Sequence, residues 1–308
     1  MSQPIDAGAL LRAATHAIDA GEDARAIQSL EALLQREPGH AEGLWQFGRY
    51  HALRGEYAEA AEHYTRAVER DPRWSHVVFA IGPHRITLRD VPGSRMPALV
   101  LGEFGLGMYG LQQRHFVADD VVLDIGAHIG AVSIILAKLH PHVRVIAYEP
   151  AASNYAMLLD NLAANHVLNV VAVREAVAGE RGTLEMMWSP SETAGASGML
   201  AESARDALER QGWERETVPC VTLDDVFAQH QLDRCAFLKL DCEGAEWEIA
   251  RHSEALSRVD TLALELHLPS SRQDEGIGAL QQEFGALLTN RSRFPAAVLS
   301  STVWMHDR

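Results

Sequence analysis

Acidic and histidine side chains follow two apolar runs in the second half of the chain. Asp241 comes directly after the run 237–240, and the run 261–267 ends with Glu265 and His267. The carboxyl ends of parallel strands meet at one edge of a sheet, and the two-residue period of a strand puts Glu265 and His267 on one face. An imidazole oriented by a carboxylate takes a proton from a hydroxyl nucleophile. We therefore expect Asp241, Glu265 and His267 to be catalytic, with His267 as the base.

The same side chains have two other interpretations. Together with Glu243 they offer the oxygen and nitrogen ligands that magnesium or calcium binds. Their spacing matches no diagnostic ligand pattern, so no metal is predicted. The remaining alternative is that they cap helices or bond backbone amides.

A glycine-containing turn follows an earlier apolar run, Val121–Ile125. Gly126 and Gly130 permit a sharp turn and a close approach of a ligand to the helix that follows. Glu149, at the end of the next run, lies 19 residues after Gly130. A carboxylate at this place accepts hydrogen bonds from ribose hydroxyls. These residues indicate a nucleoside-containing cofactor.

Two cofactor classes are compatible with this turn. A dinucleotide fingerprint needs a second glycine where this chain has His128, and Asp124 before the turn is unfavourable for a pyrophosphate. S-adenosylmethionine carries no phosphate, so we expect it to be the cofactor. The residues of the turn that we expect to bind it, besides Glu149, are Asp124, Gly126, Ala127, His128 and Gly130.

The elements that must position these residues alternate between strand-like and helical patterns. Strands are expected at 121–125, 143–148, 170–175, 184–188, 237–240 and 261–267, with an entry hairpin at 85–89 and 98–101. Helices are expected at 130–140, 153–166, 199–211 and 245–257. Apolar strands that alternate with helices predict an α/β fold with a doubly wound, Rossmann-like parallel sheet. The segment 189–218 is expected to be a long excursion that begins with a loop at 189–198, and it is either a substrate lid or a surface connection.

The first 75 residues repeat at an interval of 34. Gly21 and Gly55, and likewise Pro38 and Pro72, are separated by this interval. Small residues at helical spacing, a glycine turn and a final proline resemble two tetratricopeptide repeats, 7–40 and 41–74. We therefore expect an all-α domain at 1–75 and the α/β domain at 76–308. Two repeats are too few to stand alone, which favours a homodimer through the repeats, with docking of a separate protein as the alternative.

Several segments of the α/β region together resemble the FkbM family of methyltransferases. They are 121–130, 148–150, 175–177, 222–225 and, most specifically, Leu238-Lys-Leu-Asp-Cys-Glu-Gly-Ala-Glu246. The resemblance implies a class I methyltransferase fold and transfer of methyl from S-adenosylmethionine. It also implies Glu175 and Ala176 as cofactor contacts, and a hydroxyl of a small natural product, peptide or glycan as the acceptor. His128 stands where the family usually has Asn.

Two other functions remain open. The repeats favour an interaction scaffold whose α/β domain binds the cofactor without catalysis, whereas the intact Gly126, Gly130, Glu149 and Asp241 favour an enzyme. A nicotinamide-dependent dehydrogenase is disfavoured by His128.

Composition restricts the partners and the compartment. The chain has 27 Lys and Arg against 42 Asp and Glu, a net charge of −15, which disfavours binding to nucleic acid or anionic membranes. There is no signal-like or membrane-spanning segment, and the three cysteines have no paired spacing. We therefore expect a cytoplasmic protein.

Overall fold

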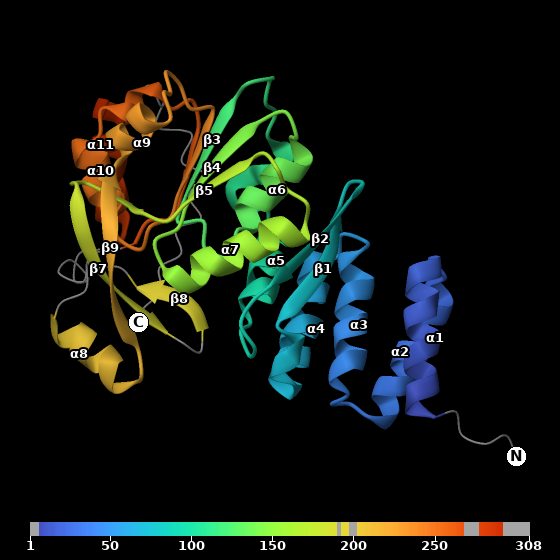
Figure 1. The fold of residues 1–308 in the computed structure, drawn as a ribbon. Helices are drawn as coiled ribbons and strands as arrows, with labels where there is room; N and C mark the ends of the chain where they lie inside the picture. The colour runs from blue at the N-terminus through green and yellow to red at the C-terminus, as the bar shows by residue number, and fades with distance from the viewer. Residues whose placement is uncertain (1–5, 190–191, 197–201, 268–276, 292–308) are drawn as a thin grey trace, which may run out of the picture. The chain divides into compact units, whose positions relative to one another are not determined.

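The computed structural model describes residues 6–189, 192–196, 202–267 and 277–291. It forms two compact units, Met1–Met108 and Tyr109–Arg308, coloured from blue to teal and from green to red in Figure 1. The first unit extends beyond residue 75, where the repeat pattern ends, because the segment that follows the repeats packs on them.

Four helices form the two repeats of the first unit. They are α1 (Ala7–Ala20), α2 (Asp23–Arg36), α3 (Ala41–Ala52) and α4 (Tyr57–Arg70). The helices of each repeat pack against each other, α1 on α2 and α3 on α4. Gly48 of α3 lies against α4 so closely that a Cβ there would sit 2.9 Å from the Tyr64 ring. The 34-residue interval is therefore the repeat of a helix pair whose small residues permit close packing.

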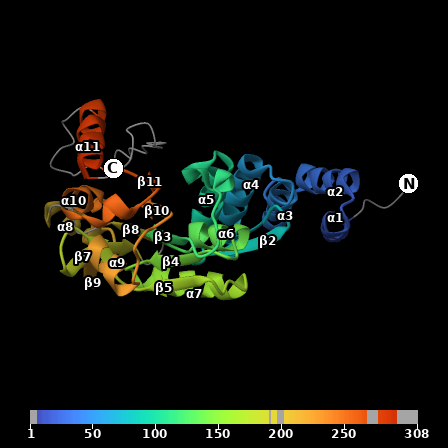
Figure 2. The same cartoon turned by 90° about the horizontal axis from the view of Figure 1, so that it is seen from above.

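A hairpin and a helix cover the end of this array. The short helix η1 (Pro72–Trp74) leads into β1 (His76–Ile81), which pairs with β2 (His84–Arg89), and α5 (Met96–Gly105) packs along α4 (Figure 2). Three aromatic side chains of the second repeat donate hydrogen bonds to backbone carbonyls of β1. These bonds are Trp45 to His76 (2.8 Å), Tyr57 to Ala80 (2.6 Å) and Tyr64 to Val78 (2.7 Å).

The prediction that 98–101 is a strand was wrong. The segment lies inside α5, and β2 pairs with β1 instead. Pro97 occupies the first turn of this helix, a position where its missing N–H costs nothing. A four-residue apolar run has no period that separates a strand from a buried helix.

The second unit is built on a five-stranded parallel sheet. Its order is β11 (Leu262–Leu264), β10 (Phe237–Leu240), β3 (Val121–Ile125), β4 (Arg144–Tyr148) and β5 (Val170–Val173). The chain runs outward from β3 through β4 to β5 and then returns to the other side of β3 with β10. The order therefore reverses between β3 and β10, the point where open α/β sheets bind their ligands.

Helices cover both faces of this sheet, so the doubly wound fold is confirmed. The helices of the sheet are α6 (Ala131–Leu139), α7 (Ala152–Ala164), α9 (Leu223–Gln229), α10 (Glu246–His252) and α11 (Ile277–Arg291), with η3 (Ala255–Arg258) before β11. Leu123 and Ile125 of β3 face a core that includes Phe227 of α9 and Trp247 of α10. Asp124 between them points to the other face, where Ser133 of α6 binds it.

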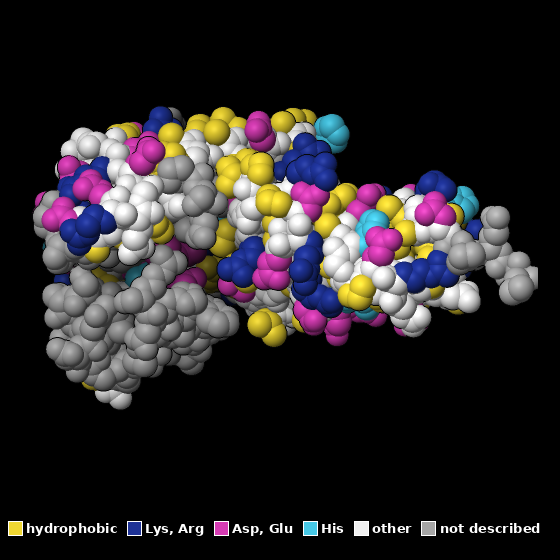
Figure 3. All heavy atoms as spheres, turned by 90° about the horizontal axis from the view of Figure 1, so that it is seen from below, with side chains coloured by type: hydrophobic (Ala, Val, Ile, Leu, Met, Phe, Trp, Pro, Cys, Tyr) yellow, Lys and Arg dark blue, Asp and Glu magenta, His cyan; other side chains and the backbone are white. Residues whose placement is uncertain are grey.

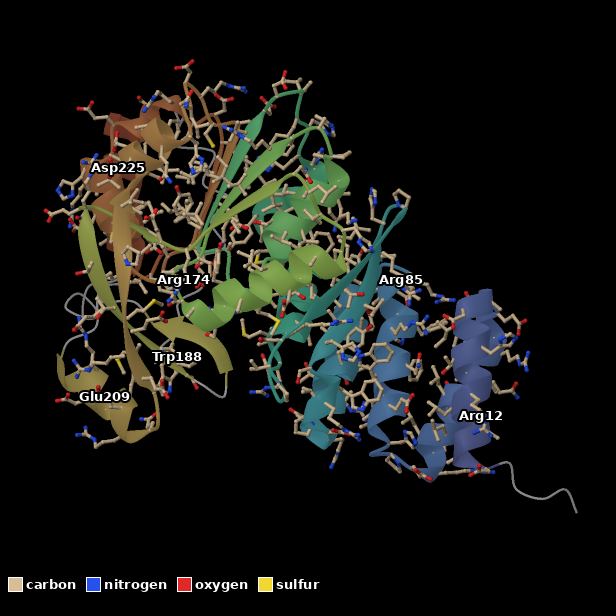
Figure 4. All side chains as sticks on the ribbon, in the orientation of Figure 1. Arg12, Arg85, Arg174, Trp188, Glu209 and Asp225 are labelled. Atoms are coloured by element: carbon tan, nitrogen blue, oxygen red, sulfur yellow. The ribbon has the colours of Figure 1, made fainter. Side chains whose placement is uncertain are left out.

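A second sheet occupies much of the chain between β5 and α9. It consists of β6 (Ala176–Ala178), β9 (Glu214–Thr222), β7 (Gly182–Ser189) and β8 (Glu192–Ala196) in that order, with α8 (Glu202–Arg210) between β8 and β9. Trp188 of β7 and Glu209 of α8 are labelled in Figure 4; Glu209 pairs with Arg215 of β9. The prediction of a loop over 189–198 was therefore wrong for β8, whereas α8 confirms the helix expected at 199–211. Residues 190–191 and 197–201 lie outside the described residues.

Candidate active site

The turn between β3 and α6 is tied to the end of β4. The backbone N–H groups of Gly126 and Ala127 both donate to the carbonyl of Tyr148, at 2.9 Å each. Gly126 has φ +79°, and Gly130 has φ +88° with its Cα against Leu158 of α7. The turn thus has the glycine-dependent backbone that the sequence predicts.

Gly126 also abuts the end of β10. A Cβ at this position would lie 1.7 Å from the backbone oxygen of Asp241. The N–H of Asp241 donates to the carbonyl of Ile125 at 3.1 Å. The turn after β3 and the loop after β10 are therefore in direct backbone contact.

Glu149 lies at the end of β4, where the sequence places it, and is 4% exposed. Its Oε2 accepts the N–H of His128 (2.8 Å), and its Oε1 accepts the N–H of Ala151 (3.0 Å). Burial raises the pKa of Glu149, and these bonds together with His128 partly offset that rise. Since each carboxylate oxygen accepts two hydrogen bonds, Oε2 keeps room for a further donor.

Three predicted cofactor residues have different surroundings. Asp124 is fully buried beneath the turn, where it accepts a 2.6 Å hydrogen bond from Ser133 Oγ. Glu175 follows β5, and its Oε2 is buried with no hydrogen-bond partner in the described part of the chain. Ala176 begins β6 and pairs with Cys220 in the second sheet.

The three predicted catalytic side chains do lie together. Asp241, Glu265 and His267 come from the ends of β10 and β11 and each places one polar atom within 4.8 Å of the others. His267 Nε2 is 3.6 Å from Glu265 Oε1 and 3.7 Å from Glu243 Oε2. Adjacent parallel strands thus assemble the group, as their spacing predicts.

Glu246 is a member of this group that sequence reasoning did not single out. Its fully buried carboxylate accepts the backbone N–H groups of Cys242 (2.8 Å) and Gly244 (3.0 Å). It also binds His267 Nδ1 at 3.2 Å. The sequence feature that could have identified Glu246 is its place in the first turn of the helix after Gly244, where a carboxylate can accept bonds from backbone N–H groups that have no partner within the helix.

The carboxylates determine the charge of His267. Burial lowers its pKa, but Glu246, Glu243 and Asp241 outweigh burial and raise it to about 10. At neutral pH the ring is therefore an imidazolium, which has no lone pair with which to accept a proton or bind a cation. The base role expected for His267 does not fit this protonation state. Asp241, Glu265 and His267 also lie close enough together to ligate a divalent cation, with which the proton of His267 would compete.

Asp241 has the opposite balance. Burial raises its pKa, whereas Lys239, His267 and the hydrogen bonds from Lys239 and Tyr109 lower it below its ordinary value. Lys239 Nζ lies 3.0 Å from Asp241 Oδ2, and the hydroxyl of Tyr109 donates to the same oxygen at 3.3 Å. Asp241 is thus an ionised carboxylate whose side chain remains 24% exposed at the end of β10.

Comparison with known proteins assigns the family. A model described as the Methyltransferase FkbM domain matches residues 124–290, more than half of the chain. The chain belongs to the FkbM methyltransferase family. A tetratricopeptide-repeat model matches 41–74, the second repeat. Membership makes this FkbM protein an S-adenosylmethionine-dependent methyltransferase.

Its relatives are similar at moderate identity. Methyltransferase sdnD of Sordaria araneosa is 28% identical over 197 residues, which cover 56% of this chain and 75% of sdnD. The 31-O-demethyl-FK506 methyltransferase FkbM of Streptomyces tacrolimicus is 29% identical over 171 residues, covering 48% of this chain and 65% of that relative. A solved structure of precorrin-6y C5,15-methyltransferase from Geobacter metallireducens aligns over 59% of this chain and 69% of its own, with a TM-score of 0.31 and 16% identity. Among the described residues, no helix has the length and apolar character needed to cross a membrane.

Proposed function

We propose that this FkbM methyltransferase methylates a hydroxyl group of a small natural product, peptide or sugar, and that Asp241 receives that hydroxyl. The observation that carries the proposal is the ionised Asp241 carboxylate beside the glycine turn. A carboxylate accepts a hydrogen bond from a hydroxyl donor, whereas an ammonium acceptor would first have to lose its proton. The name of the Streptomyces tacrolimicus relative, which specifies a 31-O-demethyl compound, supports the same chemistry.

The residues around the turn fit S-adenosylmethionine. Gly126 and Gly130 give the turn its left-handed backbone, Oε2 of Glu149 can accept a further hydrogen bond, as from a ribose hydroxyl, and Oε2 of Glu175 is an unpartnered buried acceptor among the described residues. We propose that these residues and His128 hold the cofactor. When bound, S-adenosylmethionine supplies an electrophilic methyl group on a sulfonium.

Asp241 would then do two things. It orients the acceptor oxygen for an in-line displacement, for which positioning is the largest requirement. It also takes the hydroxyl proton as the new oxygen–carbon bond forms. Lys239 and the His267 imidazolium keep Asp241 ionised, and Tyr109 fixes one of its oxygens.

The test uses the full chain with a panel of methyl glycosides, hydroxy acids and hydroxylated peptides. Calorimetry measures binding of S-adenosylmethionine and of NAD, and mass spectrometry measures adenosylhomocysteine and a 14 Da gain on the acceptor. Transfer only to amines would reject the hydroxyl proposal. Cofactor binding without transfer to any acceptor class would favour the scaffold function.

We propose further that the chain forms a homodimer through its repeats and acts in the cytoplasm, the latter supported by three free cysteines. Within residues 6–108 the large hydrophobic side chains that are exposed, Leu99 and Leu106, lie outside the repeats. Figure 3 shows basic and acidic side chains interspersed over the part of the molecule that carries the N-terminus. The interface of the proposed dimer is therefore polar, and light scattering in 0.1 M and 0.5 M salt tests whether the dimer forms and whether salt dissociates it. A constant 33.8 kDa mass would favour docking of a different protein.

A further inference from the structure

Lys239 lies where the cofactor turn and the acceptor side of the site meet. It is the third residue of β10, is 3% exposed, and shares its sheet face with Asp124 and Asp241. The chain contains two lysines, this one and Lys138 at the end of α6. A fully buried ammonium must have partners, because an unpaired buried charge is very costly.

The partners of Lys239 come from β3 with the turn that follows it and from the loop after β10, and the carbonyl of Ile125 lies 3.5 Å from its Nζ. Its Nζ donates to the carbonyl of Gly126 at 2.5 Å and to Oδ2 of Asp241 at 3.0 Å. Asp124 Oδ1 lies 3.6 Å away on the third side. An ammonium has three donors, and here two of them connect the turn after β3 to the carboxylate after β10.

The two loops are also in direct backbone contact. A Cβ on Gly126 would overlap the carbonyl of Asp241, and the N–H of Asp241 donates to the carbonyl of Ile125. Lys239 adds a charged link across the same junction. Burial lowers its pKa, while Asp241 and Asp124 raise it above its ordinary value, so the link stays charged.

We propose that Lys239 is a positioning residue that transmits cofactor binding at the Gly126 turn to the orientation of Asp241. The inference rests on the proposed function, since it gives Asp241 its role. In this proposal Lys239 acts through the Gly126 carbonyl and the Asp241 carboxylate.

The first test is spectroscopic and needs no acceptor. Lysine labelled with carbon-13 at Cε gives two side-chain signals in the full chain, and Lys138→Arg assigns them. S-adenosylmethionine and, separately, Asp241→Asn should each shift the Lys239 signal and leave the Lys138 signal in place. A Lys239 signal unmoved by saturating cofactor would overturn the coupling.

The second test removes the ammonium without leaving Asp124 as an unpaired buried charge. Hydrogen exchange is compared between Asp124→Asn and Asp124→Asn/Lys239→Met. Exchange over 241–246 should be about tenfold faster in the double variant, and S-adenosylmethionine should slow it only in the single variant. Equal exchange in the two proteins, with and without cofactor, would refute the proposal.

A turnover measurement separates positioning from a general loss of structure. The assay uses an acceptor found in the panel. Lys239→Met should lower kcat about 100-fold in the wild-type background but less than threefold in Asp241→Asn. The second loss is small because Lys239 acts through the Asp241 carboxylate, which Asp241→Asn has already removed. Additive losses would make the role structural. If the chain binds no cofactor, the proposed function fails. Hydrogen exchange over 241–246 measured without cofactor would still decide whether Lys239 holds this loop.

Discussion

Gly126→Ala tests the contact on which the site depends. At φ +79° an alanine costs about 1–2 kcal/mol in backbone strain. Its Cβ would also lie 1.7 Å from the Asp241 oxygen, which must retreat to at least 3.0 Å. That shift of more than 1 Å breaks the bond from Asp241 N–H to Ile125 and stretches the bond from Lys239 to Gly126. Breaking the first bond and weakening the second, which involves a charged donor, adds about 2–3 kcal/mol.

Gly212→Ala is the matched control. Gly212 has φ +90°, and a Cβ added there would have no other atom within 4 Å, so alanine costs only the backbone strain. We expect Gly126→Ala to melt about 5–10 °C below Gly212→Ala, as 2–3 kcal/mol implies for a unit of this size. Calorimetry should show S-adenosylmethionine affinity at least tenfold weaker. Melting within 2 °C of the control, with affinity within threefold of wild type, would refute the reasoning.

Three further changes have defined outcomes. Asp241→Asn should lower turnover about 100-fold and leave the cofactor dissociation constant within threefold, by kinetics and calorimetry; parallel losses would make it a cofactor ligand. Glu149→Gln should weaken cofactor binding about tenfold, because its amide nitrogen cannot accept the bonds that the carboxylate accepts, whereas the exposed Glu185→Gln should not. His63 has its pKa lowered to about 4 by burial, with His51 and Arg66 contributing. As the pH falls, His63 is therefore protonated in the unfolded state before it is protonated in the folded state. The free energy of unfolding consequently decreases as the pH drops from 6.5 towards 4. Urea unfolding should therefore give a free energy of unfolding about 1 kcal/mol lower at pH 5 than at pH 7.5, a figure already reduced for solvent screening. His63→Phe should lack this loss, and an equal loss in both proteins would contradict the assignment.

The strands that carry the site were predictable because each is a continuous apolar run that is followed by acidic, histidine or glycine residues. Asp241 and His267 could be placed together from the parallel-sheet rule alone, although 26 residues separate their numbers. The glycine turn was predictable for the same reason, since few residues other than glycine adopt its backbone.

The charge state of the site was not predictable from these patterns. It depends on Glu246, which a helix turn aims at His267 from a different strand end. Whether an imidazole is a base or an imidazolium follows from distances of a few ångströms, and sequence spacing does not specify these. The second sheet was missed in part because β9 carries charged residues that do not resemble a buried strand.

The covered end of the repeat array has an evolutionary consequence. Trp45, Tyr57 and Tyr64 of the second repeat are bonded to the backbone of β1, and α5 lies along α4. A third repeat inserted after residue 74 would compete with the hairpin for the same hydrogen bonds. Further repeats are therefore accommodated before the second repeat more readily than after it.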